Sequence, residues 1–266
     1  MATSGKDFRL ESDLIGERQI SNEHLYGVQT LRGIENFNIS NFHLCDYPLF
    51  IHGLAWTKEA AAIANHRLGL LTDQQKDAIV QACHELLEGK HHQHFPVDMI
   101  QGGAGTTTNM NANEVICNRA LEIMGHEKGE FKYLSPNDHV NGSQSTNDAY
   151  PTAIHLGLYA SHLKLRPHFI QLIEALEKKS KEFAHVVKMG RTQLQDAVPM
   201  TLGQTFGGFA SILRHEIANL DYAAHQFLAI NMGATAIGTG ISSEPEYAGY
   251  CTEAMAKITG WDITLT

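Results

Sequence analysis

The sequence predicts a mainly α-helical protein, in which a mostly helical N-terminal domain precedes the first long helices of a central helical bundle. Apolar residues recur at the spacing of one helix face in successive stretches of the 266-residue chain. Two T-x-x-Q capping boxes, at 72–75 and 201–204, mark helix starts. Two periodic stretches, about 149–183 and 201–231, reach thirty residues, or roughly 45 Å. Helices that long need partner helices along their apolar stripe, which predicts a bundle and favours an oligomer.

Composition excludes several classes of partner. Hydrophobic content of 43% and charged content of 18% are ordinary for a globular protein. The net charge of −9, without a Lys/Arg cluster, argues against nucleic-acid and anionic-membrane binding. The first thirty residues contain no apolar signal core, and no apolar run approaches membrane-spanning length. We therefore expect neither secretion nor membrane insertion.

Cysteine and histidine usage favours a cytoplasmic protein without a metal. The four cysteines form no C-x-x-C pair and are expected to be reduced and mostly buried (Cys45, Cys83, Cys117 and Cys251). His91, His92 and His94 lie close together, but no second ligand pair accompanies them in a zinc pattern. They follow Gly89 at a helix end, so a surface loop is the interpretation favoured over a metal site.

The first half of the chain predicts an arm and two helices. Residues 1–48 lack a sustained period, which predicts an irregular arm with short strands or turns. A helical pattern with an Ala-rich centre then runs from about Pro48 to Leu70. The box at Thr72 opens a second helix, which Gly89 ends.

A glycine-rich turn at 101–109 feeds the next predicted helix, which ends at Gly125. It fits neither G-x-x-x-x-G-K-[ST] nor G-x-G-x-x-G, and no strong strand precedes it, so it is not a nucleotide loop. Two interpretations remain open. The segment is a plain turn and cap, or its backbone approaches a small anion beside the hydroxyl groups of residues 106–108.

The polar run 141–148 leads into a helix that starts near Ala149. Pro151 suits a first helical turn, and four successive residues are good N-caps (Ser145, Thr146, Asn147 and Asp148). A cap needs only one or two such residues. The run therefore serves either as a solvated cap or as a set of hydroxyl, amide and N–H donors for a carboxylate at the positive end of a helix.

The second half of the chain predicts long helices joined by polar turns. Pro167 is expected to kink or interrupt the helix from Ala149, giving two collinear helices or one bent helix. The polar insert 190–199 is longer than a simple connection needs. The box at Thr201 opens a helix to about Asn231.

A third Gly/Thr-rich turn, 231–240, precedes a helix at about 244–258. The two long helices are too few to complete the predicted bundle, so we expect this chain to be the N-terminal portion of a longer protein. The change from shorter to longer helices predicts a domain over 1–142 and the first part of the bundle domain over 143–266.

Three polar segments carry the candidate chemistry: 102–109, 143–148 and 191–196. They contain no carboxylate dyad, Ser/His/Asp set or metal cluster. All three segments carry hydroxyl and amide groups, which can hold a carboxylate at a helix end through neutral hydrogen bonds. The residues alone thus predict a small carboxylic acid ligand, with two anionic ends.

Five longer motifs resemble those of the aspartate ammonia-lyases, in the aspartase/fumarase superfamily. They occupy 101–115, 135–141, 143–152, 190–200 and 233–240, and the likeness extends from Gly16 onward. Fumarases typically carry G-S-G-T and Ser-Ser-Asn-Asp. The Gly-Gly-Ala-Gly-Thr turn and Thr146 therefore favour the aspartase side.

The resemblance implies reversible elimination of ammonia from L-aspartate to give fumarate, with no cofactor and no metal. Residues that match the family's substrate contacts are Thr106, Ser145 and Thr146 for the carboxylate and ammonium ends, Asn147 near the amino group, and Thr192 and Gln193. Thr192 matches a carboxylate contact, whereas Gln193 occupies a position where many superfamily members have His. Gln donates and accepts hydrogen bonds but does not shuttle a proton near neutral pH.

The family's catalytic serine lies in a G-S-S-x-M-P-x-K-x-N loop that these 266 residues do not contain. No catalytic residue is therefore assigned, and the resemblance implies an active site assembled by several subunits of a homotetramer. We expect the chain to be inactive alone. Two alternatives stay open: a non-catalytic assembly or binding fragment, and a fumarate hydratase.

Overall fold

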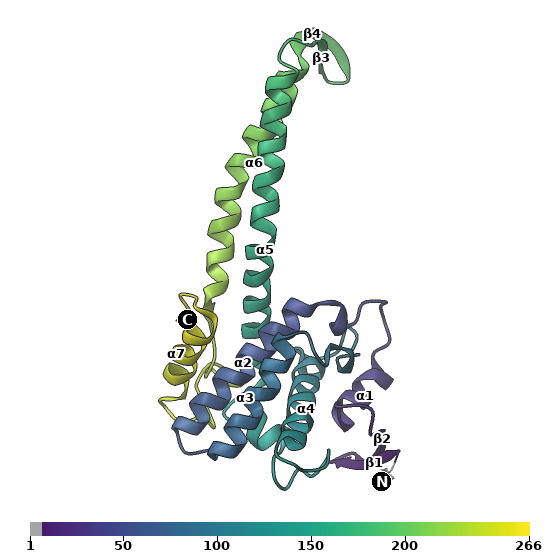
Figure 1. Ribbon diagram of the computed structural model, residues 1–266, viewed down its shortest axis with the longest axis vertical. Coiled ribbons are helices and arrows are strands. Elements are labelled where there is room, and N and C mark those ends of the chain that lie inside the picture. Colours follow the sequence, from purple (N-terminus) through teal and green to yellow (C-terminus); the bar gives the residue numbers. More distant parts are fainter. Residues whose placement is uncertain (1–6) are drawn as a thin grey trace. The chain divides into compact units, whose positions relative to one another are not determined.

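A computed structural model describes residues 7–266, and they form a mainly helical fold, as predicted (Figure 1). The chain divides into two compact units, one built from residues up to 158 together with 228–266, the other from 159–227. Among residues 7–266, no helix combines the length and the apolar run that crossing a membrane requires.

The arm contains two short strands and a helix, and its first six residues lie outside the described part. Strands β1 (Phe8–Asp13) and β2 (Gly16–Ser21) pair antiparallel, and α1 (Val28–Asn36) follows. The N–H groups at the start of α1 are capped by carboxylates from other parts of the chain. The Glu11 carboxylate accepts from the Val28 N–H, and the Glu114 carboxylate accepts from the N–H groups of Gly27, Gln29 and Thr30. The expectation of short strands and turns is thus confirmed for residues 7–48, with a helix added.

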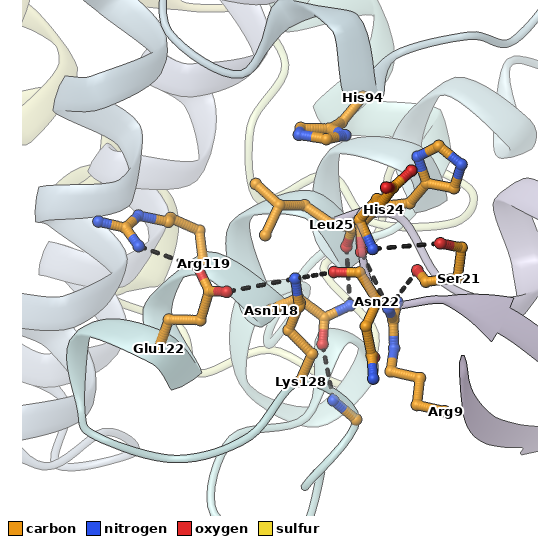
Figure 2. Close-up of polar contacts among 12 residues, drawn as sticks. Arg9, Ser21, Asn22, His24, Leu25, His94, Asn118, Arg119, Glu122 and Lys128 are labelled. Carbon is orange, nitrogen blue, oxygen red and sulfur yellow. Dashed lines mark hydrogen bonds and ion pairs between the residues drawn. The ribbon is translucent and has the colours of Figure 1, made fainter. Parts of the chain in front are cut away.

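Polar contacts hold the arm against the following helices (Figure 2). Arg9 donates to the carbonyl oxygens of Ser21 and His24 at 3.1 and 2.9 Å. The Asn118 side chain donates to the Leu25 carbonyl at 2.7 Å, and Lys128 donates to the carbonyl of Asn22. The Arg9 side chain thus bonds two parts of the arm to each other, whereas Asn118 and Lys128 hold the arm's backbone from the following part of the chain.

Three helices form the core of the first unit: α2 (Pro48–Arg67), α3 (Asp73–Leu87) and α4 (Thr106–Ile123). Contacts link α2 to α3 and α3 to α4, and Figure 1 shows the three side by side. The predicted box at Thr72 is present, with reciprocal bonds to Gln75. The core is aliphatic and fully buried at its centre (Ile51, Leu54, Ile79, Leu86, Ile116 and Leu121).

Short elements join these helices: the 3₁₀ turns η1 (Leu44–Asp46) and η2 (His92–His94), and the π-helical turn η3 (Pro136–Val140). The first unit ends with β5 (Ala229–Ile230), α7 (Tyr247–Thr259) and β6 (Thr264–Leu265), of which the two strands pair parallel. His94 is 8% exposed, so the surface-loop expectation is wrong for this histidine. Its ring lies near those of His24 and His91, which cover it.

The long helix α5 (Thr146–Glu182) is continuous through Pro167. Pro167 therefore does not interrupt the helix, and the alternative of two separate helices is wrong. Its ring removes only one N–H donor from the helix. Residues 159–182 belong to the second unit, with β3 (Val187–Thr192), β4 (Gln195–Thr201) and α6 (Leu202–His225).

In this second unit α5 and α6 run side by side, with the β3–β4 hairpin at one end (Figure 1). The polar insert is thus an antiparallel hairpin, which the sequence did not predict. The box at Thr201 is confirmed, but α6 ends at His225 rather than near Asn231, because a 3₁₀ turn, η4 (Gln226–Leu228), and β5 follow.

Candidate functional site

The glycine-rich turn is locked onto the first turn of α4. Gly105 is the N-cap and has φ of +87°, and a Cβ there would lie 2.5 Å from the Tyr150 ring. Gln101 accepts a hydrogen bond from the Thr108 N–H at 2.9 Å and donates to its hydroxyl oxygen at 2.8 Å. Glycine is therefore required at 105 by conformation and by space. Thr106, the first residue of α4, is left exposed.

The start of α5 carries a reciprocal cap. The Ser145 hydroxyl accepts from the Asn147 N–H at 3.2 Å, and the Asp148 carboxylate accepts from the Ser145 N–H at 2.9 Å. The N-cap prediction is thus confirmed for Ser145, and the helix starts at Thr146, three residues before the expected Ala149. The Thr146 hydroxyl oxygen accepts from the Asn109 side chain at 3.2 Å.

The third Gly/Thr-rich turn is fastened to this helix start. Fully buried Asp148 accepts from the N–H groups of Gly233 and Thr235 at 3.1 and 2.9 Å. The exposed Asn147 side chain donates to the Ala236 carbonyl at 2.8 Å, and Asn231 donates to the Asn147 carbonyl. Burial raises the pKa of Asp148, and the N–H donors oppose that shift.

The glycine-rich turn and the start of α5 line a common pocket of about 550 Å³. Its wall combines the glycine-rich turn with the first turn of α5 (Met99, Gln101, Gly103, Ala104, Gly105, Asn147, Tyr150 and Pro151). The N-termini of α4 and α5 adjoin it, and helix N-termini favour anions. Of the predicted residues, Asn147 lines the pocket, Thr106 and Thr146 start its two helices, and Ser145 caps the second.

A larger pocket, of about 690 Å³, lies beside the arm and includes Asp13, Gln29 and Glu114. Its acidic groups are already engaged: Asp13 pairs with Arg32 at 2.7 Å, and Glu114 accepts three backbone N–H groups. Burial raises the pKa of Glu114 to about 7. The two carboxyl groups in the wall of this pocket make it less suited to an anion than the smaller pocket, whose lining residues include no acidic side chain.

Thr192 and Gln193 lie in the second unit, at the turn of the β3–β4 hairpin. Thr192 pairs with Gln195, so Gln193 and Leu194 form a two-residue turn with φ of +46° and +66°. Both φ values are positive, as in the type I′ turns that usually carry Asn-Gly. The Thr192 and Gln193 side chains are exposed.

Sequence reasoning missed a buried lysine and its partners. The Nζ of Lys58 in α2 donates to side-chain oxygens of Asn109, Asn141 and Gln144 at 2.7, 3.1 and 2.8 Å. Burial lowers the pKa of Lys58 to about 7, while the nearby Asp148 carboxylate opposes that shift. One signal was available: Lys58 and Glu59 interrupt an Ala-rich, otherwise apolar stretch of helix. A charged pair there is unusual because lysine and glutamate are rarely buried.

Comparison with known proteins places the chain in one family. A profile of the lyase family matches residues 16–265. The chain is 53% identical to aspartate ammonia-lyase of Helicobacter pylori over 95% of its length, and 50% identical to that of Escherichia coli over 96%. It covers 54% of each relative, so it spans about half the length of the curated relatives it matches. The resemblance predicted from the motifs is confirmed.

Solved structures agree. A fumarate lyase:delta crystallin from Brucella melitensis, bound to cobalt, superposes with a TM-score of 0.94 at 47% identity, over 97% of this chain and 56% of the other. A class II fumarase from Schistosoma mansoni gives a TM-score of 0.86 at 36% identity, over 95% of this chain and 53% of the other. The predicted fold class is thereby confirmed.

Proposed function

The chain belongs to the lyase family, and from that membership we propose that it is part of an aspartate ammonia-lyase, which reversibly eliminates ammonia from L-aspartate to give fumarate. The carrying observation is the pocket between the glycine-rich turn and the start of α5, where two helix N-termini and Asn147 meet. The identity to aspartate ammonia-lyases supports the choice of substrate. A small dicarboxylate suits a site with many neutral donors.

In the proposed reaction, a base outside these 266 residues removes a proton from Cβ of aspartate. The neighbouring carboxylate takes up the charge as a dianion, and the C–N bond then breaks. Donors from Thr106, Ser145 and Thr146 lower the barrier if they bind the dianion more tightly than the ground-state carboxylate. Asn147 would orient the amino group by accepting a hydrogen bond at its side-chain oxygen, while its NH₂ group keeps the bond to the Ala236 carbonyl.

The proposal assigns the remaining contacts to a homotetramer. Exposed Thr192 would supply a carboxylate contact to a site in another subunit, and Gln193 would hold the leaving amino group without exchanging a proton. The apolar groove of Leu176, Phe209, Ile212 and Leu213 supports burial of the second unit against further helices. No cofactor is part of the proposal. Free cysteines support a cytoplasmic location, also proposed.

The test adds L-aspartate to the full-length protein and follows the ultraviolet absorbance of fumarate. We expect a steady rise, and none from the 266-residue chain alone. Absence of any rise with the full-length protein would refute the proposal. Because a class II fumarase is also similar to this chain, L-malate is the matched alternative substrate. Faster fumarate formation from malate than from aspartate would identify a fumarate hydratase instead.

A further inference from the structure

Lys58 is fully buried, yet no carboxylate pairs with its ammonium group directly. Its three partners are amide oxygens from three separate places: Asn109 in α4, Asn141 after η3, and Gln144 before α5. An ammonium group has three N–H donors, which matches three acceptors. A neutral amine has only two N–H groups and would turn its lone pair toward one of the three amide oxygens, which is a repulsive contact. The site is thus built around the charged form, despite the cost of burying it.

The lysine dictates which way the Asn109 amide points. Its Oδ1 accepts from Lys58 at 2.7 Å, so its Nδ2 must face the opposite way. That Nδ2 donates to the Asn141 side-chain oxygen at 3.0 Å and to the Thr146 hydroxyl oxygen at 3.2 Å. With the amide reversed, an oxygen would face Thr146 and an NH₂ group would face the ammonium. The second contact is repulsive, so the lysine excludes the reversed orientation.

The orientation of Asn109 decides what the Thr146 hydroxyl can do. When the hydroxyl oxygen accepts from Asn109, its own proton remains available for another acceptor. In the reversed arrangement Thr146 would spend that proton on the Asn109 oxygen. A carboxylate oxygen is purely an acceptor, so only the observed orientation leaves Thr146 able to bind one.

We propose that Lys58 is a positioning residue of the carboxylate site: its buried ammonium group fixes Asn109, and Asn109 keeps the Thr146 hydroxyl proton free for the substrate. This inference rests on the proposed function, because it assigns Thr146 to the substrate carboxylate. Lys58 does not touch substrate. The intervening amide passes on orientation rather than a proton, so Lys58 is not a catalytic acid or base.

The kinetic test is a double-mutant cycle in the full-length protein with Lys58→Met, Thr146→Val and the double variant. Each single change is expected to lower kcat/KM for L-aspartate at least tenfold, and the double variant to be little worse than the poorer single variant. The exposed Lys90→Met is the matched control, with kcat/KM unchanged. Effects that multiply in the double variant would overturn the proposal, because Lys58 would then act independently of Thr146.

Asn109→Asp covers the case in which Lys58→Met does not fold. The new carboxylate keeps an acceptor for Lys58 but takes the Thr146 proton, so a tenfold or larger loss of kcat/KM is expected from a protein with wild-type circular dichroism. Wild-type kinetics in Asn109→Asp would overturn the proposal.

A spectroscopic readout separates this inference from the proposed function. In ¹⁵N spectra of the 266-residue chain, the Asn109 side-chain NH₂ should exchange slowly with water, and Lys58→Met should accelerate that exchange at least tenfold while distant backbone amides stay unchanged. If full-length wild-type protein leaves aspartate intact, the proposed function fails, and with it the assignment of Thr146 to substrate. The NH₂ exchange still decides the link from Lys58 to Asn109, and unchanged exchange would overturn it.

Discussion

The two groups of candidate substrate contacts are held in opposite ways. Thr146 and Asn147 lie at a helix start that is held by contacts within the first unit: Thr146 accepts from buried Asn109, Asn147 donates to the Ala236 carbonyl, and buried Asp148 accepts from the preceding Ser145 N–H. Thr192 and Gln193 lie at an exposed two-residue turn, where Gln193 and its neighbour Leu194 have positive φ. Each group belongs to a different compact unit.

This difference shows how one chain can build two kinds of binding surface. The first is preorganised, since its donors are fixed by contacts within the same unit before any ligand arrives. The second stores backbone strain at its tip and keeps its side chains free. Substitutions at the two places should therefore differ in what they change: fold stability and ligand geometry in the first, and local hairpin stability in the second.

The largest effect is expected from Asp148→Ala. This change leaves the buried N–H groups of Gly233 and Thr235 and the partly buried N–H of Ser145 without their acceptor. Each unsatisfied group costs about 1–3 kcal/mol, so the free energy of unfolding should fall by about 3 kcal/mol or more. Urea denaturation measures it.

The matched change in the hairpin is Asp196→Ala. Asp196 pairs with Arg191 at 3.1 Å, and both side chains are mostly exposed. Exposed pairs contribute about 0–1 kcal/mol, so a loss of roughly 0.5 kcal/mol or less is expected. An equal loss of unfolding free energy in Asp148→Ala and Asp196→Ala would contradict the proposed difference between the buried and the exposed group of contacts.

The second effect depends on pH and concerns the helices that support the first group. Glu85 accepts from Arg119 at 2.6 Å and contacts His91 at 2.8 Å. The Arg119 hydrogen bonds lower the pKa of Glu85 from 4.5 to about 2. The depressed pKa means that this stabilisation is present above pH 4.5 and disappears as the pH falls toward 2.

Glu85→Gln should therefore cost about 2 kcal/mol at pH 7 and close to nothing at pH 2, as read from denaturation midpoints across that range. Glu177→Gln is the control from the other unit. It removes an exposed pair with Arg214, and we expect a change of about 0.5 kcal/mol or less at every pH. A constant cost of Glu85→Gln between pH 7 and pH 2 would contradict the mechanism.

Whether an interaction could be predicted from the sequence depends on how far apart its two residues lie along the chain. The box at Thr72 was predicted because its bonds to Gln75 span three residues, and Ser145 was recognised as a cap for the same reason. Lys58 was missed because its partners lie 51, 83 and 86 residues away. The charged pair in an Ala-rich helix signals that Lys58 is unusual, but no local pattern shows which distant residues it contacts.

The β3–β4 hairpin was missed for a different reason. Its turn, Gln193-Leu194, lacks the Asn-Gly signal that normally marks a two-residue turn. The polar residues around it were recognised as too many for a simple connection, but their conformation was not. Sequence motifs thus predicted Thr192 and Gln193 as candidates through the family resemblance, while the strained backbone that presents them came only from the structure.

A third, smaller effect separates binding from capping at the start of α5. Asn147→Ala should lower kcat/KM for L-aspartate in the full-length protein about tenfold, or about 1.4 kcal/mol, through loss of the contact near the amino group. Steady-state kinetics measure it, with the exposed Asn219→Ala as control. Normal kinetics in Asn147→Ala would mean that this side chain serves only to hold the Ala236 carbonyl.

The smallest effect tests the strain at the hairpin tip. Leu194 is almost fully exposed and has φ of +66°, a conformation that costs a non-glycine residue about 1–2 kcal/mol. Leu194→Gly should relieve that strain, partly offset by the entropy of glycine, and leave a gain of about 0.5 kcal/mol. Slower hydrogen exchange of the ladder amides between Thr192 and Gln195 would register it.

Leu14→Gly is the matched control, because Leu14 is equally exposed in the turn between β1 and β2 but is not among the residues with positive φ. Glycine at position 14 brings only its entropic cost. The backbone amides of the β1–β2 hairpin should therefore exchange with water faster, by a factor that corresponds to about 0.5–1 kcal/mol. Opposite signs at the two leucines would locate the strain in the hairpin that carries Gln193. The same sign at both would show that the positive φ at Leu194 carries no measurable strain.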